Sequence, residues 1–136
     1  MAVDPSLAGR SFPATEPYVV SHEKIREFAV ATGSSYGGSD APAPATFLIV
    51  VAFRAMTALM EDPEVGIALH RVVHGEQRFV YTRPVVAGDA LSARLTVDSL
   101  RQIGGADIIA TRSEISDAAG NPVCTAFATL VHRGED

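Results

Sequence analysis

Two stretches of the sequence hold residue types from which a functional site could be built. The first, ATGSSYGGSDAPAPATF at residues 31–47, contains serines, a tyrosine and one carboxylate, Asp40, but no histidine, lysine or arginine. The second, HGEQRFVYTRPVVAGD at residues 74–89, places His74, Glu76 and Gln77 at the expected start of a strand. General acid and base catalysis requires side chains that exchange protons near the working pH. The first stretch lacks such groups, and polar side chains like those of the second are commonplace at exposed strand starts.

The end of the first stretch could bind a ligand through its backbone. The prolines at 42 and 44 prevent a helix before about Ala45, and the apolar run that follows predicts a helix from there. The free N–H groups at Ala45 and Thr46 would then offer a site for a carbonyl oxygen or an anion. Capping of the helix by Thr46 and neighbouring loop groups explains the same residues equally well.

Other chemistries find little support in the sequence, so we expect no metal site, no cofactor and no catalytic residue on this chain. The four histidines are scattered, and Cys124 has no second thiol with which to form a metal site. The GSSYGGS segment follows a helix, whereas a phosphate-binding glycine loop follows a strand and opens into a helix. Cys124 alternates with its neighbours in a predicted strand and reads as a small buried hydrophobe.

Two helices are predicted in the first half of the chain. Ser21 is a good N-cap, Glu23 lies in the first turn and Gly33 supplies a stop, which predicts an amphipathic surface helix between Ser21 and Gly33. The second helix, TFLIVVAFRAMTALM, is apolar on every face and ends at Asp62 and Pro63. Such a helix must be surrounded by protein on nearly all sides.

The second half of the chain alternates with period two and predicts an antiparallel sheet. The four predicted strands are QRFVYTRPVV, ALSARLTVDSLRQI, ADIIATRSEIS and PVCTAFATLVHR, joined by AGD, GG and DAAGN turns. YVV at 18–20 is at best a short edge strand. The pattern predicts one long meander that forms a curved sheet around the central helix, an α+β fold within a single domain, residues 1–136.

Composition limits the possible partners and location. With 136 residues, 11 basic and 16 acidic, the chain has a net charge of −5 and no basic cluster, which argues against nucleic acid. The longest apolar run, Ala45 to Met60, is interrupted by Arg54 and falls short of a membrane span. One cysteine and no signal-peptide pattern predict a cytoplasmic protein.

Three segments together resemble the MaoC-like hot-dog dehydratases, in particular the FAS1-like dehydratase domains of actinobacterial (3R)-hydroxyacyl-ACP dehydratases. They are GRSFPATEPYVVSHEKIREFAVATG at 9–33, APATF at 43–47 and HGEQRFVYTRPVVAGDAL at 74–91, and the last is the most specific. The resemblance implies a hot-dog fold, in which an antiparallel sheet wraps a long central helix. It also implies that two such domains pair, that their sheets continue across the interface, and that an acyl-thioester channel lies near it.

The chain departs from catalytic members of this family in the loop after the first helix. There the family carries Thr-Gly, an aspartate, Asn-Pro and a histidine, and the aspartate and histidine act as the acid and base. Thr32 and Gly33 match, but Ser34 takes the place of the aspartate, and the Asn-Pro and the histidine are missing. Asp40 aligns with an acid only if the gap is shifted. The family also has a longer stretch before the helix.

The resemblance therefore implies a non-catalytic subunit of a (3R)-hydroxyacyl-ACP or CoA dehydratase. We expect this chain to form a dimer and favour a heterodimer over a homodimer. We expect Pro44, Ala45, Thr46 and Phe47 to contact the acyl-thioester substrate, together with His74 and Gln77. The catalytic residues would come from a separately encoded hot-dog chain, in fatty-acid elongation or in polyketide assembly.

Two alternatives remain. The first is a homodimeric protein that binds acyl thioesters without turnover. The second is a hot-dog thioesterase, which requires a carboxylate on or near the central helix to activate water, and Glu61 lies at its far end.

Overall fold

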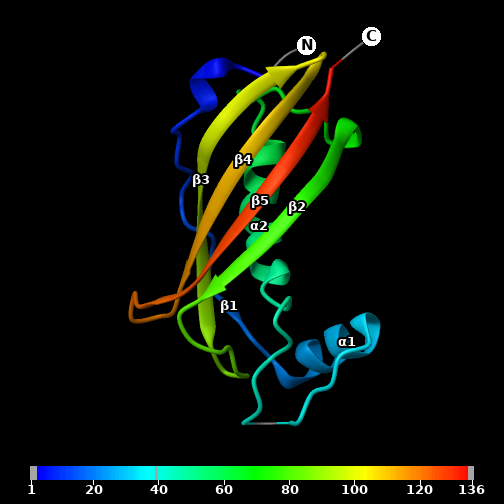
Figure 1. Ribbon diagram of the computed structural model, residues 1–136. Helices are drawn as coiled ribbons and strands as arrows, with labels where there is room; N and C mark the ends of the chain where they lie inside the picture. The colour runs from blue at the N-terminus through cyan, green and yellow to red at the C-terminus, as the bar shows by residue number, and fades with distance from the viewer. Residues whose placement is uncertain (1–2, 39, 135–136) are drawn as a thin grey trace.

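The computed structural model describes residues 3–38 and 40–134 and shows a curved antiparallel sheet with a helix along one face (Figure 1). In chain order the elements are η1 (Pro5–Leu7), β1 (Tyr18–Val19), α1 (His22–Thr32), α2 (Ile49–Glu61), η2 (Leu69–Arg71), β2 (Val72–Tyr81), β3 (Ala90–Ile103), β4 (Ala106–Ser116) and β5 (Pro122–Arg133). α1 lies beyond the end of the sheet, and α2 runs along its inner face.

The boundaries of α1 agree with the prediction because short-range signals determine both ends. The Ser21 side chain accepts a hydrogen bond from the Lys24 N–H, which satisfies one of the free donors of the first turn. At the other end Gly33 adopts a left-handed conformation with φ of 70°, which ends the helix at little steric cost.

The strand order is β1-β3-β4-β5-β2, so the predicted meander is wrong at its first step. β2 pairs with β5 and not with β3, and its other edge is free of any described strand. The AGD segment does not close a hairpin, because the Gly88 N–H donates to the Val20 carbonyl and the Val20 N–H donates to the Asp89 carbonyl. These two bonds attach the segment after β2 to the chain beside β1, at the opposite edge of the sheet.

β2 also begins and ends earlier than the predicted strand QRFVYTRPVV. It starts at Val72 and ends at Tyr81, before Pro84. A break in the pairing register with β5 lies between His74 and Glu76. Such a bulge interrupts the alternation of side chains, so a period-two pattern does not detect the first part of the strand.

The core lies between α2 and the inner face of the sheet. Its largest fully buried side chains include Phe47, Leu48, Met56, Leu59, Leu91, Leu95, Ile109 and Ile115. The expectation that α2 is surrounded on nearly all sides does not hold in the single chain, because Phe53 on its outer face is 50% exposed. The sheet covers only one side of the helix. In the described residues, no helix has the length and apolar character that crossing a bilayer requires.

α2 begins at Ile49, four residues after the predicted start. In an α-helix starting at Ala45, the Ala45 carbonyl would accept from the Ile49 N–H. The Tyr81 hydroxyl donates to that carbonyl instead, and the Ile49 N–H donates to the Thr46 carbonyl. A contact with a distant strand therefore keeps residues 45–48 in turns ahead of the helix.

Candidate functional site

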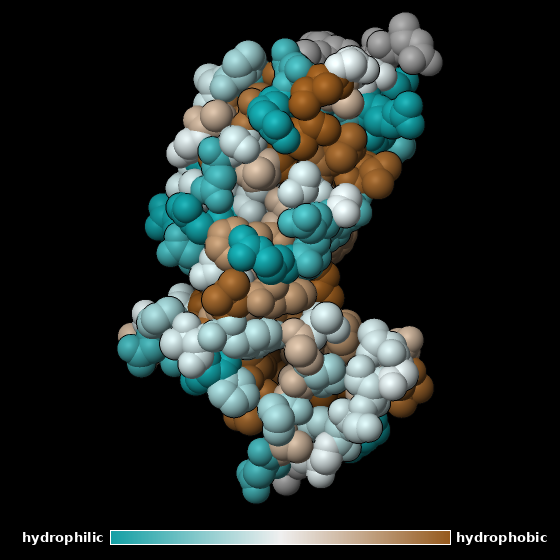
Figure 2. Space-filling view, in the orientation of Figure 1, coloured by the Kyte–Doolittle hydropathy of each residue, from teal (hydrophilic) through white to brown (hydrophobic). Residues whose placement is uncertain are grey.

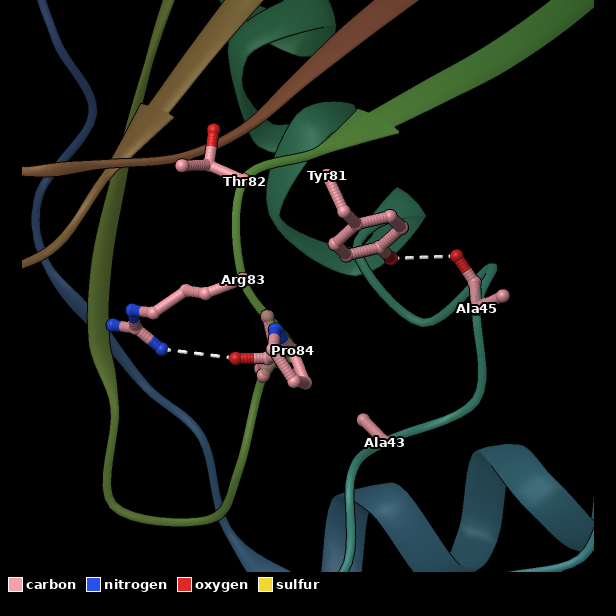
Figure 3. Close-up of a pocket in the computed structure, with 7 residues that line it drawn as sticks. Ala43, Ala45, Tyr81, Thr82, Arg83 and Pro84 are labelled. Atoms are coloured by element: carbon pink, nitrogen blue, oxygen red, sulfur yellow. Dashed lines mark hydrogen bonds between the residues drawn. The ribbon is translucent and has the colours of Figure 1, made fainter.

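A pocket lies where the chain enters α2, between the preceding loop and the end of β2 (Figure 3). Its volume is about 400 Å³, and it is lined by Ala43, Ala45, Tyr81, Thr82, Arg83, Pro84 and Val85. Two hydrogen bonds hold its two walls together. The Tyr81 hydroxyl donates to the Ala45 carbonyl at 2.5 Å, and the Ala43 N–H donates to the Val85 carbonyl at 2.7 Å. We call this the α2-entrance pocket.

Tyr81 acts in this pocket as a neutral hydrogen-bond donor. Burial raises the pKa of its phenol to about 12, repulsion from an ionised Cys124 adds to the rise, and the Leu48 N–H opposes it. A phenol with this pKa keeps its proton near neutral pH and is a poor general base there. Its proton is directed at the Ala45 carbonyl, so the side chain organises the turn ahead of α2.

Cys124 lies opposite Tyr81 on β5, on the same inner side of the sheet. Its side chain is buried at 2% exposure, as the alternation pattern predicts. Burial raises the pKa of its thiol to about 11, against a smaller opposite effect from the Val80 N–H. The reactive form of cysteine is the thiolate. Cys124 therefore packs as a small apolar residue beside the pocket.

Arg83 is the only cation among the lining residues of this pocket, and carboxylates already neutralise it. Its guanidinium pairs with both oxygens of Asp89, at 3.0 and 3.3 Å, and with Asp117 at 3.4 Å. The hydrogen bond that Arg83 donates to Asp89 is the main reason that the pKa of Arg83 is raised. Arg83 also donates to the Pro84 carbonyl, as Figure 3 shows. Its role is to fix the chain between β2 and β3.

The loop before the pocket directs its polar groups elsewhere. The Tyr36 hydroxyl and the Nδ1 atom of His22 form a hydrogen bond of 2.6 Å, which attaches the loop to the first residue of α1. Thr32 and Ser34 form a hydrogen bond with each other at 3.0 Å. Asp40 is exposed to solvent. The lining of the α2-entrance pocket contains no carboxylate and no imidazole.

Of the residues expected at the α2 entrance to bind substrate, only Ala45 lines the pocket. Pro44 is half-buried beside it, and Thr46 faces solvent. Phe47 is fully buried, and its ring meets that of Phe28 edge-on, with the ring centres 5.5 Å apart. It belongs to the hydrophobic core.

His74 and Gln77 lie near the other end of β2. The His74 Nε2 and Gln77 Oε1 atoms are 2.9 Å apart and form a hydrogen bond. Four residues of strand separate Gln77 from Tyr81, or about 13 Å. The structure therefore does not bring His74 and Gln77 to the α2-entrance pocket.

Sequence reasoning missed the lining residues from Tyr81 to Val85. One signal could have identified Tyr81, because Gln77, Phe79 and Tyr81 alternate along β2 and share one face of the strand. Their partners on β5 are Ala128, Ala126 and Cys124, all buried, so this face points toward the core.

A curved antiparallel sheet that packs against a central helix is the architecture of a hot-dog fold. The FAS1-like dehydratase domain region matches residues 6–126, so the chain belongs to the FAS1-like dehydratase domain family. It is 43% identical to a UPF0336 protein of Streptomyces avermitilis over 148 aligned residues, which cover 100% of this chain and 99% of that protein. Its identity to a UPF0336 protein of Leifsonia xyli is 47%, with 98% of each covered.

Solved structures agree with this assignment. A chain of the HadBC (3R-hydroxyacyl-ACP dehydratase) complex from Mycobacterium tuberculosis superposes with a TM-score of 0.81 and 30% identity, covering 92% of this chain and 96% of that one. A MaoC-like dehydratase superposes with a TM-score of 0.80 and 29% identity, covering 96% of this chain and 43% of the other. The similarity thus extends over nearly the whole chain.

Proposed function

We propose that this chain is the non-catalytic subunit of a heteromeric dehydratase that acts on (3R)-hydroxyacyl thioesters. The observation that carries the proposal is the lining of the α2-entrance pocket. It contains no carboxylate and no imidazole, although the chain belongs to a family of dehydratase domains. Dehydration at the second and third carbons of an acyl chain needs a base with a pKa near the working pH. Tyr81, with a pKa of about 12, does not meet that requirement.

The free edge of β2 supports a paired arrangement. This strand exposes its unpaired backbone groups, and Val73 and Val80 on it are 56% and 50% exposed. Hydrophobic residues gather on the upper part of the sheet and toward its β2 side in Figure 2. Unprotected apolar edges are sites for pairing with another strand. The solved HadBC structure is that of a (3R)-hydroxyacyl-ACP dehydratase complex, and we propose that this chain likewise works in a complex.

In the proposed pair the partner supplies the catalytic aspartate and histidine. This chain would supply part of the wall of the acyl channel, where Pro44, Ala45, Thr46, His74 and Gln77 remain the predicted contacts, whereas Phe47 supports that wall from the core. Acyl carrier protein or coenzyme A would carry the thioester, in fatty-acid or polyketide elongation in the cytoplasm. The alignment with the Streptomyces avermitilis protein spans 148 positions, whereas this chain has 136 residues. That relative therefore has at least 12 residues with no counterpart in this chain. We propose that these come mainly from the loop ahead of α2.

The decisive experiment compares the chain alone with the chain co-expressed beside each hot-dog protein of the same organism that retains the Asp and His motif. We expect no hydration of crotonyl-CoA by the isolated chain, and a stable pair whose hydration rate depends on the partner's dyad. Robust activity of the isolated chain that Asp40→Asn or His74→Gln abolishes would contradict the proposal. A homodimer that binds acyl thioesters and pairs with no such protein would instead favour a binding protein without turnover.

A further inference from the structure

A second pocket lies at the opposite end of β2, where the connection from α2 enters that strand. Its volume is about 260 Å³, and it is lined by Gly66, Ile67, Ala68, His70, Arg71, His132 and Arg133. His132 is 2% exposed and forms the inner wall. Its Nε2 atom accepts a hydrogen bond from the Ala68 N–H at 3.0 Å, and its Nδ1 atom faces Asp107 at 3.2 Å. These bonds hold the connection against the end of β5.

This pocket carries positive charge that the described chain does not neutralise. The guanidinium of Arg71 is held in place, because its Nη1 donates to the Gly134 carbonyl at 2.8 Å. Within residues 3–38 and 40–134, neither Arg71 nor Arg133 forms an ion pair, whereas Arg83 in the α2-entrance pocket has two carboxylate partners. Asp107, behind His132, already accepts hydrogen bonds from the Val3 N–H and Gln102. The pocket is therefore suited to an anion.

The donors indicate the kind of anion. Guanidinium groups present planar pairs of N–H donors that match the oxygens of a phosphate. His70 is exposed at the rim and adds a further imidazole donor. A phosphate group at the end of a longer ligand would meet two guanidinium groups and an imidazole, with the rest of the ligand leaving through the open side.

The position that the pocket would take beside a partner indicates which phosphate fits, and here the inference rests on the proposed function. When two hot-dog sheets join at their β2 edges with both helices on one face, the two strands run antiparallel. The start of β2 in one chain then lies beside the end of the matching strand in its partner. Arg71 directly precedes β2, and the α2-entrance pocket adjoins its last residue, Tyr81. In such a pair, each basic pocket would lie next to the other subunit's α2 entrance.

We propose that the pocket of His70, Arg71 and Arg133 binds the 4′-phosphate of the pantetheine arm whose thioester reacts in the partner subunit. The non-catalytic chain thereby anchors the substrate from outside while the partner performs the chemistry. Both a carrier protein and coenzyme A present this phosphate. The ligand is defined by the phosphorylated arm, and the experiment separates its two sources.

The test uses the reconstituted pair with Arg71→Gln and Arg133→Gln combined in this chain. The control combines Arg94→Gln and Arg101→Gln, which remove two exposed arginines from β3 and give the same change in net charge. The substrates are crotonyl-CoA, crotonyl-4′-phosphopantetheine and crotonylpantetheine, which lacks the phosphate. We expect KM to rise on the order of tenfold for the two phosphorylated substrates, with kcat and the KM of crotonylpantetheine unchanged. The control should leave all three unchanged.

Three results would overturn the proposal. These are equal effects on all three substrates, no effect on any of them, or an effect on crotonyl-CoA alone, which would assign the pocket to the nucleotide phosphates. A binding measurement separates this inference from the proposed function. In the isolated chain, 4′-phosphopantetheine but not pantetheine should shift the NMR signal of the Ala68 amide, and the double variant should lose that shift. Binding without any hydratase activity of a pair would refute the proposed function and retain the phosphate site.

Discussion

The two ends of β2 use their polar side chains in different ways. Beside the start of β2, Asp107 and His132 are 3% and 2% exposed and are bonded to each other. Asp107 also accepts hydrogen bonds from the Val3 N–H and Gln102, and His132 accepts one from the Ala68 N–H. At the α2 entrance, an open pocket of about 400 Å³ is lined mainly by alanines, a proline and a valine, and its tyrosine and arginine already have partners within the chain.

This difference shows that an acid and a histidine in contact do not by themselves make a catalytic pair. The Asp107 and His132 pair has the residue types of the dyad that the resemblance implies for catalytic members. Its hydrogen bonds are made within the chain and attach the N-terminal segment and the α2 to β2 connection to the sheet. The α2 entrance has room for a ligand but no acid or base. Three substitutions test this division, from the largest expected effect to the smallest.

Phe47→Ala should cause the largest loss of stability, because this side chain lies in the core although it was expected to contact substrate. Its exposure is 0%, and it packs edge-on against Phe28. We expect the free energy of unfolding of the isolated chain to fall by about 3–5 kcal/mol in urea denaturation. Phe53→Ala is the matched control, because Phe53 is 50% exposed on α2, and it should cost under about 1 kcal/mol. Equal losses would show that Phe47 is not a core residue in solution.

Asp107→Asn should produce the next largest effect. An asparagine retains one acceptor oxygen but places an amide donor where three donors now converge, from the Val3 N–H, Gln102 and His132. We expect a loss of about 1–3 kcal/mol in the free energy of unfolding. Asp98→Asn, which removes an exposed partner of Arg112, should cost about 0–1 kcal/mol and serves as the control.

The pH dependence of the Asp107→Asn effect sharpens this prediction. Burial raises the pKa of Asp107, but the hydrogen bonds from the Val3 N–H, His132 and Gln102 outweigh it and leave the pKa below 3.8. A carboxylate with a lowered pKa stabilises the fold above the unfolded value, and this contribution disappears as the pH falls through the folded value. The gap in stability between wild type and variant should therefore narrow as the pH drops below 3.8. A gap that is constant with pH would mean that the charge of Asp107 does not matter.

Local signals predicted much of the fold. Ser21 and Gly33 define α1 because each acts within one helical turn, and the last three strands follow from alternation bounded by glycine turns. The start of α2 could not be predicted in this way. It depends on Tyr81, which donates to Ala45 across 36 positions of sequence. The position of β2 beside β5 depends on pairing that no turn residue encodes.

The site was less predictable than the fold for the same reason. Ala45 was predicted, because the prolines before it mark the entrance to α2. The segment from Tyr81 to Val85 joins it only because β2 lies at that edge of the sheet. The contact of His132 with Ala68 spans 64 positions, and sequence spacing gave no sign of the basic pocket beside it.

Tyr81→Phe should have the smallest effect on stability and the most specific dependence on pH. Removing the hydroxyl leaves the Ala45 carbonyl without its donor, which should cost about 0.5–1.5 kcal/mol. Because the pKa of Tyr81 is about 12 in the folded chain against 10.0 for a free tyrosine, the unfolded chain loses this proton first as the pH rises. Wild-type stability should fall between pH 10.0 and about 12, and the variant should lack that decline. The loss between pH 9.0 and about 11 that belongs to Cys124 should remain in both proteins.

Tyr18→Phe is the control, since its hydroxyl makes no hydrogen bond within residues 3–38 and 40–134 while its ring packs under Arg54. If Tyr81→Phe and Tyr18→Phe gave the same alkaline profile as wild type, Tyr81 would not be the group that organises the entrance to α2.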